Sequence, residues 1–117
     1  MRPLVLKLTA GADAPERCLQ GLTVASVALA AGAEVSLWLT GESVWLATPE
    51  GELELAESPP ASTLLTAVLV GGRVQVCTQC AARRGLAQGD LRPGAVIAGA
   101  GSFVEQALAP EVQALVY

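Results

Sequence analysis

The sequence predicts a three-layer α/β fold with a mostly parallel sheet, built as a single domain over residues 1–117. Segments with a strand-like pattern alternate with segments with a helix-like pattern along the whole chain. A first strand, a helix and a second strand follow one another within about 40 residues, which is enough for a βαβ unit. The chain shows no internal repeat, no low-complexity tract and no change of composition that would mark a second domain.

The first predicted unit opens with a strand at residues 4–8, whose nearly continuous apolar run is typical of the middle of a parallel sheet. A helix is expected to begin at residues 13–16, because Asp13 stands three residues ahead of Glu16 and a proline lies in the first turn. One apolar stripe of this helix consists of Cys18, Leu22, Ala25 and Leu29. Gly32 ends the helix, and residues 34–39 form the second strand.

The rest of the chain continues this alternation. Residues 42–47 are expected to form a helical turn. Residues 48–60 contain three prolines and predict an exposed loop or an edge ribbon whose acidic side chains are solvated. The later predicted elements are a helix at 62–69, a strand at 73–76, a helix at 78–84, a helix at 103–108 capped by Ser102, and a strand at 112–116.

The composition is unusually apolar for a protein of this size. Hydrophobic residues make up 52% of the chain and charged residues 15%, so much of the surface is expected to be apolar, small or covered by another subunit. This composition predicts self-association. No apolar run reaches the ~18–20 residues that a membrane-spanning helix needs, and the first residues show no signal-peptide pattern. We therefore expect a soluble, cytoplasmic protein with no membrane partner.

Charge and motif content exclude several classes of function. The net charge is −4 and the seven basic residues are scattered, which argues against nucleic acid as a direct partner. The chain has no paired carboxylates, no serine–histidine–aspartate pattern and no phosphate-binding loop, so acid–base hydrolysis is unsupported and no cofactor is expected. The three cysteines, an odd number, do not suggest a disulfide framework.

Cys77 is the leading candidate for a reactive group. It follows a short β-branched run and precedes a helix-forming run that ends in two arginines and a glycine. Cys77 is therefore expected at the carboxyl end of a strand and the amino end of a helix, where unpaired N–H groups and the helix dipole stabilise an anion. Such a position lowers the pKa of a thiol without a histidine, a residue that the chain lacks. The alternative is that Cys77 is a small buried hydrophobic residue.

The other two cysteines lead to different expectations. Cys80 forms a Cys-x-x-Cys pair with Cys77, which raises a dithiol redox function of thioredoxin type. Against this, Val76 stands where the thioredoxin pattern has an aromatic residue, and the pair lies two-thirds along the chain. A structural zinc site needs four ligands and only Cys18 is left to join, so no metal site is expected. Cys18 lies on the inward stripe of the first helix and is expected to be a packing residue.

Two other motifs have both a structural and a functional interpretation. Arg83 and Arg84 complement the dipole at a helix end, or one of them holds an anionic group near the thiol, although nearly two helical turns separate them from Cys77. Residues 99–102 (Gly-Ala-Gly-Ser) form either an anion-binding turn or a place where backbones pack closely.

Three motifs are shared with a known family. They are Thr9-Ala10-Gly11 after the opening strand, the run Leu-Thr-Gly-Glu-Ser-Val at residues 39–44, and Val76-Cys77 with the run Arg-Arg-Gly at residues 83–85. On these motifs the chain resembles the DsrE/DsrF-like family of small sulfur-relay proteins, and its TusD-like members in particular, over nearly its whole length. The resemblance implies a flavodoxin-like sheet, trimers or hexamers, and a cysteine, here Cys77, that takes up sulfur as a persulfide and hands it on. TusD-like members have a small apolar residue in the place of Cys80, whereas other members of the family carry a second cysteine.

These observations lead to three hypotheses. The leading one is an intracellular sulfur carrier with sulfurtransferase-like chemistry, in which Cys77 bears the persulfide and Cys80 is an optional second thiol. Sulfur donor and acceptor proteins are the partners that it requires. The second is a dithiol redox protein that cycles a Cys77–Cys80 disulfide, and the third is a non-catalytic oligomeric binding module whose cysteines only pack.

Overall fold

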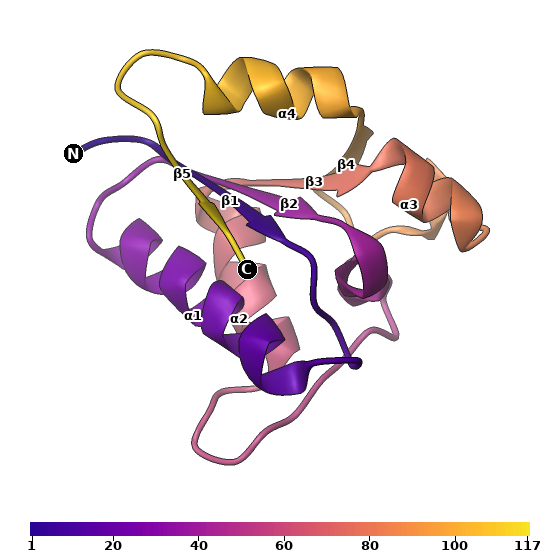
Figure 1. The fold of residues 1–117 in the computed structure, drawn as a ribbon. Helices are drawn as coiled ribbons and strands as arrows, with labels where there is room; N and C mark the ends of the chain where they lie inside the picture. Colours follow the sequence, from indigo (N-terminus) through magenta and orange to yellow (C-terminus); the bar gives the residue numbers. More distant parts are fainter.

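The computed structural model describes all 117 residues (Figure 1). The strands are β1 (Leu4–Leu8), β2 (Val35–Leu39), β3 (Arg73–Cys77), β4 (Ala95–Ala98) and β5 (Gln113–Val116). The helices are α1 (Pro15–Ala30), α2 (Ala61–Gly71), α3 (Thr78–Arg83) and α4 (Ala100–Ala107), with two short 3-10 helices, η1 (Gly41–Ala47) and η2 (Gln88–Asp90). None of these helices combines the length and the apolar character that crossing a membrane requires. The alternation of strands and helices confirms the predicted α/β class.

All five strands join one sheet in the order β4-β3-β2-β1-β5. Every neighbouring pair is parallel, so the sheet is wholly parallel where the sequence predicted a mostly parallel one. Parallel neighbours cannot be joined by a tight hairpin, and a helix therefore lies between each strand and the next. The strand order changes direction at β1, which lies between β2 and β5.

The two faces of the sheet are covered unequally. In Figure 1, α1 and α2 lie beneath the sheet, α4 lies above it, and α3 lies beyond the ends of β3 and β4. The hydrophobic core fills the space between the sheet and the pair α1 and α2, and Leu6, Leu8, Leu37 and Leu39 contribute fully buried side chains to it. The opposite face is covered only by the eight residues of α4.

The start of α1 is where the sequence predicts it, but its predicted cap is wrong. The carboxylate of Asp13 accepts a hydrogen bond from the backbone N–H of Gly11 at 2.8 Å and therefore shapes the preceding turn. No side chain caps α1, whose first residue is Pro15, a position where the missing N–H has no consequence. The predicted inward stripe is confirmed, with three fully buried members and Leu29 half-buried: Cys18, Leu22 and Ala25 have no exposed surface.

The loop at residues 48–60 contains no strand, so the edge-ribbon alternative is wrong. The expectation that its acidic side chains are simply solvated is also wrong for Glu52. The Glu52 carboxylate accepts hydrogen bonds from the backbone N–H of Ser62, at 2.9 Å, and from the Ser62 hydroxyl. Hydrogen bonding from that hydroxyl lowers the pKa of Glu52. The exposed Glu52 carboxylate thus accepts a hydrogen bond from one of the backbone N–H groups that have no partner within the first turn of α2, which begins at Ala61.

The beginning of α4 also differs from the prediction. The helix starts at Ala100, three residues before the predicted start, and Ser102 lies inside its first turn instead of capping it. Gly99 is the N-cap residue, and its carbonyl oxygen accepts hydrogen bonds from the backbone N–H groups of Ser102 and Phe103. The chain therefore passes from β4 into α4 with a single intervening residue.

A seam of hydrogen-bonded side chains holds α4 against the sheet, and its members are Ser36, Trp38, Gln75 and Gln106. Gln106 of α4 accepts hydrogen bonds at its Oε1 from the Trp38 indole N–H, at 3.1 Å, and from the Ser36 hydroxyl, at 2.7 Å. The Ser36 hydroxyl also lies 2.8 Å from Oε1 of Gln75 on the neighbouring strand. Trp38 is 1% exposed, so its indole N–H has no access to water if Gln106 is removed.

Replacing Gln106→Ala is expected to destabilise the protein by about 1–3 kcal/mol, because the buried Trp38 donor loses its acceptor. The matched control is Gln113→Ala, since the Gln113 side chain is exposed and donates only to the adjacent Ala114 carbonyl. Urea unfolding at constant m-value measures both variants. Equal midpoints for the two variants would contradict the role assigned to the seam.

Candidate functional site

Cys77 is the last residue of β3 and the N-cap residue of α3, as the sequence predicts. The register pairs it with Ala98 at the end of β4, one residue beyond the pair formed by Leu39 and Val76. Its side chain is partly exposed at the carboxyl edge of the sheet, which is the edge where open parallel sheets hold their functional groups. It stands two strands away from β1, where the strand order changes direction.

The surroundings of the Cys77 sulfur favour its ionised form. Burial raises the pKa of the thiol, but the backbone N–H and the thiol of Cys80, the backbone N–H of Gln79 and the Lys7 ammonium all lower it. The pKa of Cys77 is therefore below its ordinary value. The sulfur forms no close capping hydrogen bond with α3, so the amides act on it through longer contacts. The environment is one that produces a thiolate without a histidine.

Lys7 is a charged neighbour of Cys77 that the sequence analysis missed. Lys7 pairs with Trp38, and Trp38 pairs with Gln75, so these side chains lie on the same face of the sheet as Cys77, which is two residues further along β3. A strand spacing of about 4.8 Å and a rise of about 3.3 Å per residue place the Cα atoms of Lys7 and Cys77 roughly 12 Å apart. The long lysine stem shortens the gap between the two charges.

The ammonium of Lys7 is held by an aromatic ring. Its Nζ lies 5.4 Å from the centroid of Phe103, in the first turn of α4, and the Phe103 ring packs edge-on against Trp38 at 5.6 Å. The Lys7 ammonium forms no ion pair and no hydrogen bond with the rest of the chain. The one sequence signal for it is a single cation in the otherwise apolar run Leu-Val-Leu-Lys-Leu.

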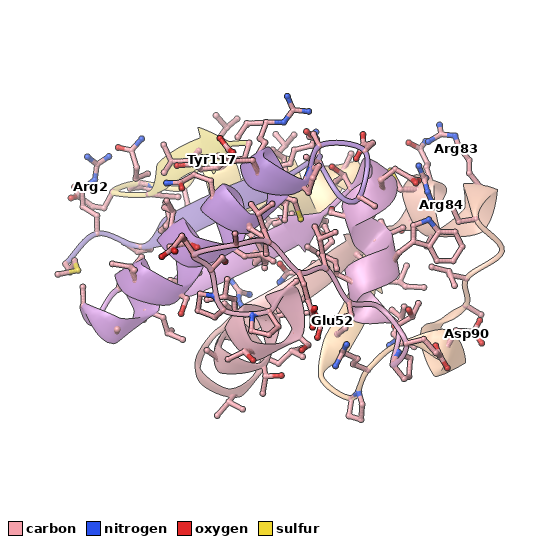
Figure 2. The ribbon with its side chains drawn as sticks, turned by 90° about the horizontal axis from the view of Figure 1, so that it is seen from below. Arg2, Glu52, Arg83, Arg84, Asp90 and Tyr117 are labelled. Atoms are coloured by element: carbon pink, nitrogen blue, oxygen red, sulfur yellow. The ribbon has the colours of Figure 1, made fainter.

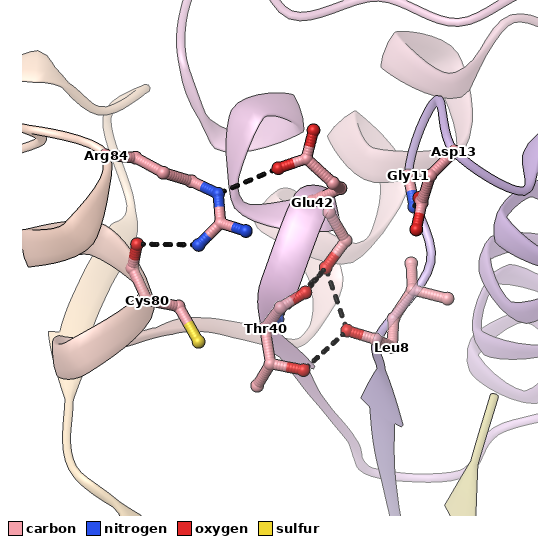
Figure 3. Close-up of polar contacts among 8 residues, drawn as sticks. Leu8, Gly11, Asp13, Thr40, Glu42, Cys80 and Arg84 are labelled. Carbon is pink, nitrogen blue, oxygen red and sulfur yellow. Dashed lines mark hydrogen bonds and ion pairs between the residues drawn. The ribbon is translucent and has the colours of Figure 1, made fainter.

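Two of the motifs behind the family resemblance meet at the carboxyl edge of the sheet. The Thr40 hydroxyl donates to the Leu8 carbonyl at 3.0 Å, and the buried Ser43 hydroxyl lies 2.8 Å from the same oxygen (Figure 3). Glycines permit this close approach. A Cβ at Gly11 would lie 2.6 Å from the Glu42 carbonyl oxygen, and Gly41 has a φ of 57°, which disfavours other residues. These contacts lock the loop after β1 to η1 at the edge that carries Cys77.

Arg84 is engaged by other groups of the protein and not by the Cys77 thiol. Its Nε donates to the Glu42 carboxylate at 2.9 Å and its Nη1 to the Cys80 carbonyl at 3.1 Å (Figure 3). It therefore ties the end of α3 to η1. Arg83 is exposed and extends outward from α3 (Figure 2). The structural interpretation of these two arginines is the one that the contacts favour, because Arg84 is engaged in an ion pair and Arg83 extends from the surface.

Cys18 is a packing residue, as predicted. It has no exposed surface, and burial, with a smaller contribution from the Asp13 carboxylate, raises its pKa to about 11. A thiol of that kind stays protonated near neutral pH and is a poor nucleophile. No group of three or more histidine, cysteine, aspartate or glutamate side chains is placed to hold a metal ion.

Residues 99–102, which are the N-cap residue Gly99 and the first three residues of α4, lie next to the candidate site. They follow Ala98, the register partner of Cys77, and the Thr78 hydroxyl oxygen is 4.0 Å from the place that a Cβ on Gly99 would occupy. The amino ends of α3 and α4 therefore start from neighbouring strand ends. Since no side chain caps α4, its first N–H groups add to the positive potential at this edge.

The thiol of Cys77 does not lie in any of the main hollows of the surface. Three hollows, of about 280 to 560 Å³, are lined by other residues, and one of them lies at the opposite edge of the sheet around Glu34, Gly72 and Arg73. The site is therefore an open edge. Such a surface suits the approach of another macromolecule better than the enclosure of a small substrate.

The sequence profile of the DsrE/DsrF-like family matches residues 4–111, a span that includes all three cysteines. The chain belongs to the DsrE/DsrF-like family. This family is associated generally with sulfur relay. The match confirms the resemblance inferred from the motifs around Gly11, Gly41 and Cys77. No sequence among curated proteins matches this member of the family.

Solved structures of other proteins share the fold of this DsrE-like chain. The ychN protein of E. coli superposes with a TM-score of 0.85 at 17% identity, with complete coverage of both chains. A protein of unknown function from Methanobacterium thermoautotrophicum gives 0.77 at 11% identity, again over both whole chains. A conserved protein of unknown function from Bacteroides thetaiotaomicron gives 0.66 at 17% identity, with 99% of this chain and 95% of the other covered. At these identities the similarity establishes the fold alone.

Proposed function

We propose that this protein is a sulfur carrier, with sulfurtransferase-like chemistry, that holds sulfur as a persulfide on Cys77. The observation that carries the proposal is a partly exposed thiol of lowered pKa at an open edge of the sheet. An ionised thiol is the form that attacks sulfur, so Cys77 is suited to this chemistry near neutral pH. Membership of the DsrE/DsrF-like family, with its general association with sulfur relay, supports the same assignment.

Loading is a thiol exchange without net oxidation. The Cys77 thiolate attacks the outer sulfur of a persulfide on a donor protein, a new sulfur–sulfur bond forms at Cys77, and the donor leaves as its thiolate. Transfer is the reverse reaction with a different partner: an acceptor thiolate attacks the outer sulfur, and Cys77 leaves as a thiolate. The backbone N–H groups at the start of α3 and the Lys7 ammonium favour the leaving thiolate and the anionic persulfide alike.

We also propose that the protein is a homo-oligomer, a trimer or a hexamer, that works in the cytoplasm with donor and acceptor proteins. Support comes from the thinly covered face of the sheet. Val96 and Val116 lie on that face on either side of α4 and are 53% and 65% exposed, and Val104 on α4 is 48% exposed. A second subunit that packed against this face would bury these side chains.

Light scattering at micromolar concentration is expected to give a mass of three or six chains. Val104→Lys should lower that mass, because it places a charge on the proposed interface. The matched control is Val70→Lys, since Val70 is even more exposed but lies on α2, at the other face. A monomeric mass for the unaltered protein, or equal masses for the two variants, would contradict this interface.

The persulfide assignment is tested by incubating the protein with a cysteine desulfurase and cysteine, followed by intact-mass measurement and peptide mapping. Cys77→Ser is expected to lose the adduct of about 32 Da completely. Cys80→Ser and Cys18→Ala should still acquire it, because neither residue is the proposed acceptor. An adduct that survives in Cys77→Ser would refute the assignment, and no adduct on any variant would favour a binding module whose cysteines only pack.

A further inference from the structure

The thiol of Cys80 lies next to the proposed sulfur-bearing residue. Cys77 is the N-cap residue of α3 and Cys80 is the third residue of that helix. Side chains at these two positions lie close together, since this is the relation in which an N-cap side chain and the third helical residue reach one another's backbone. In agreement with that geometry, Cys80 is among the groups that lower the pKa of Cys77. Neither side chain is buried, so both sulfurs are able to react.

Cys80 is held in place from two sides. Its carbonyl oxygen accepts a hydrogen bond from Arg84, which is anchored by its ion pair with Glu42. Its side chain packs against the hydrophobic core, and Figure 3 shows the sulfur turned toward the segment that carries Thr40. The Cys80 thiol is therefore already restricted in its orientation before it reacts. Such proximity favours an intramolecular reaction over attack by a thiol from solution.

We propose that Cys80 discharges the Cys77 persulfide by intramolecular attack, which releases hydrosulfide and leaves a Cys77–Cys80 disulfide. This inference rests on the proposed function, because it requires a persulfide on Cys77. It assigns to the chain a second activity, the reduction of bound sulfane sulfur to sulfide, beside sulfur transfer to an acceptor.

The step balances within the chain. The Cys80 sulfur attacks the inner sulfur of the persulfide, which is Sγ of Cys77, and a bond forms between the two cysteine sulfurs. The bond from Sγ to the outer sulfur breaks, and its electron pair leaves with the outer sulfur. The proton of the Cys80 thiol ends on the released hydrosulfide. The outer sulfur is reduced by two electrons, and the two cysteines are oxidised to the disulfide.

This chemistry sets a lifetime for the carried sulfur. An acceptor thiol must reach the outer sulfur before Cys80 reaches the inner one, so the protein transfers sulfur only while an acceptor is close at hand. A dithiol reductant or a low-molecular-weight thiol is needed to restore the two cysteines for another cycle. The second thiol therefore couples discharge to the supply of thiol reductant.

The test follows the loaded protein after its sulfur donor has been removed. Unaltered protein is charged with a cysteine desulfurase and cysteine, desalted, and incubated without reductant, while sulfide and intact mass are measured over time. We expect about one sulfide per loaded chain, and a mass that falls from about 32 Da above the reduced chain to about 2 Da below it. Peptide mapping should find Cys77 linked to Cys80, and the rate should not depend on protein concentration.

Two variants and one matched control decide the role of the second thiol. Cys80→Ser and Cys80→Ala should retain the persulfide at least about ten times longer, since neither offers an internal nucleophile of comparable strength. Cys18→Ala should behave like the unaltered protein, because Cys18 is fully buried.

The possible failures are distinguishable. Equal persulfide lifetimes in the unaltered protein and in Cys80→Ser would overturn the discharge reaction and leave the carrier function intact. Movement of the adduct onto the Cys80 peptide would also overturn it, because the attack would then be on the outer sulfur. If no variant is ever loaded, the proposed function fails, and the discharge reaction fails with it.

Discussion

The pairing of β3 between β2 and β4 is the constraint on which the candidate site depends. Because β3 has a hydrogen-bonded neighbour on each side, its end is fixed by the pair Leu39 and Val76 and by the pair Cys77 and Ala98. The chain turns directly from this end into α3, so the thiol meets unpaired backbone N–H groups. The ionisation assigned to Cys77 thus depends on backbone geometry together with the Lys7 ammonium, and it needs no histidine.

The unequal covering of the sheet joins the fold to the site. α1 and α2 bury a continuous apolar core on one face, whereas α4 alone covers the other. Gln106 fastens α4 to the sheet, and Phe103 of the same helix lies under the Lys7 ammonium on the face that carries Cys77. Helix α4 therefore covers this face and also positions the Lys7 ammonium. The apolar side chains that α4 leaves exposed are available to a second subunit.

Local patterns in the sequence predicted those features that depend on neighbouring residues. The strand-to-helix junction at Cys77 and the burial of Cys18 are of this kind. The remaining features depend on contacts between distant segments. The hydrogen bonds from Ser62 to Glu52 join two residues that a loop separates. Lys7 and Cys77 approach each other only because of the strand register. These contacts join residues that are far apart in the sequence, so local patterns do not predict them. Periodicity indicates a strand but does not give the register between three strands.

The ion pair of Arg84 illustrates the same limit at the site itself. Its position at a helix end was correctly expected, but its partner Glu42 is 42 residues away and belongs to a turn whose exact path decides the contact. The surroundings of Cys77 and the membership of the family both support the sulfur-acceptor role that we propose for it. The physical basis of that proposal is a thiol that ionises readily.

The ionisation of Cys77 is tested most directly by a pH titration of its thiolate, followed by ultraviolet absorbance in the Cys80→Ser variant. Cys18 does not interfere, because its pKa is about 11. We predict an inflection below the ordinary pKa of a cysteine thiol, and an upward shift when Lys7→Met removes the nearby cation. An inflection at or above the ordinary value, unchanged by Lys7→Met, would contradict this prediction.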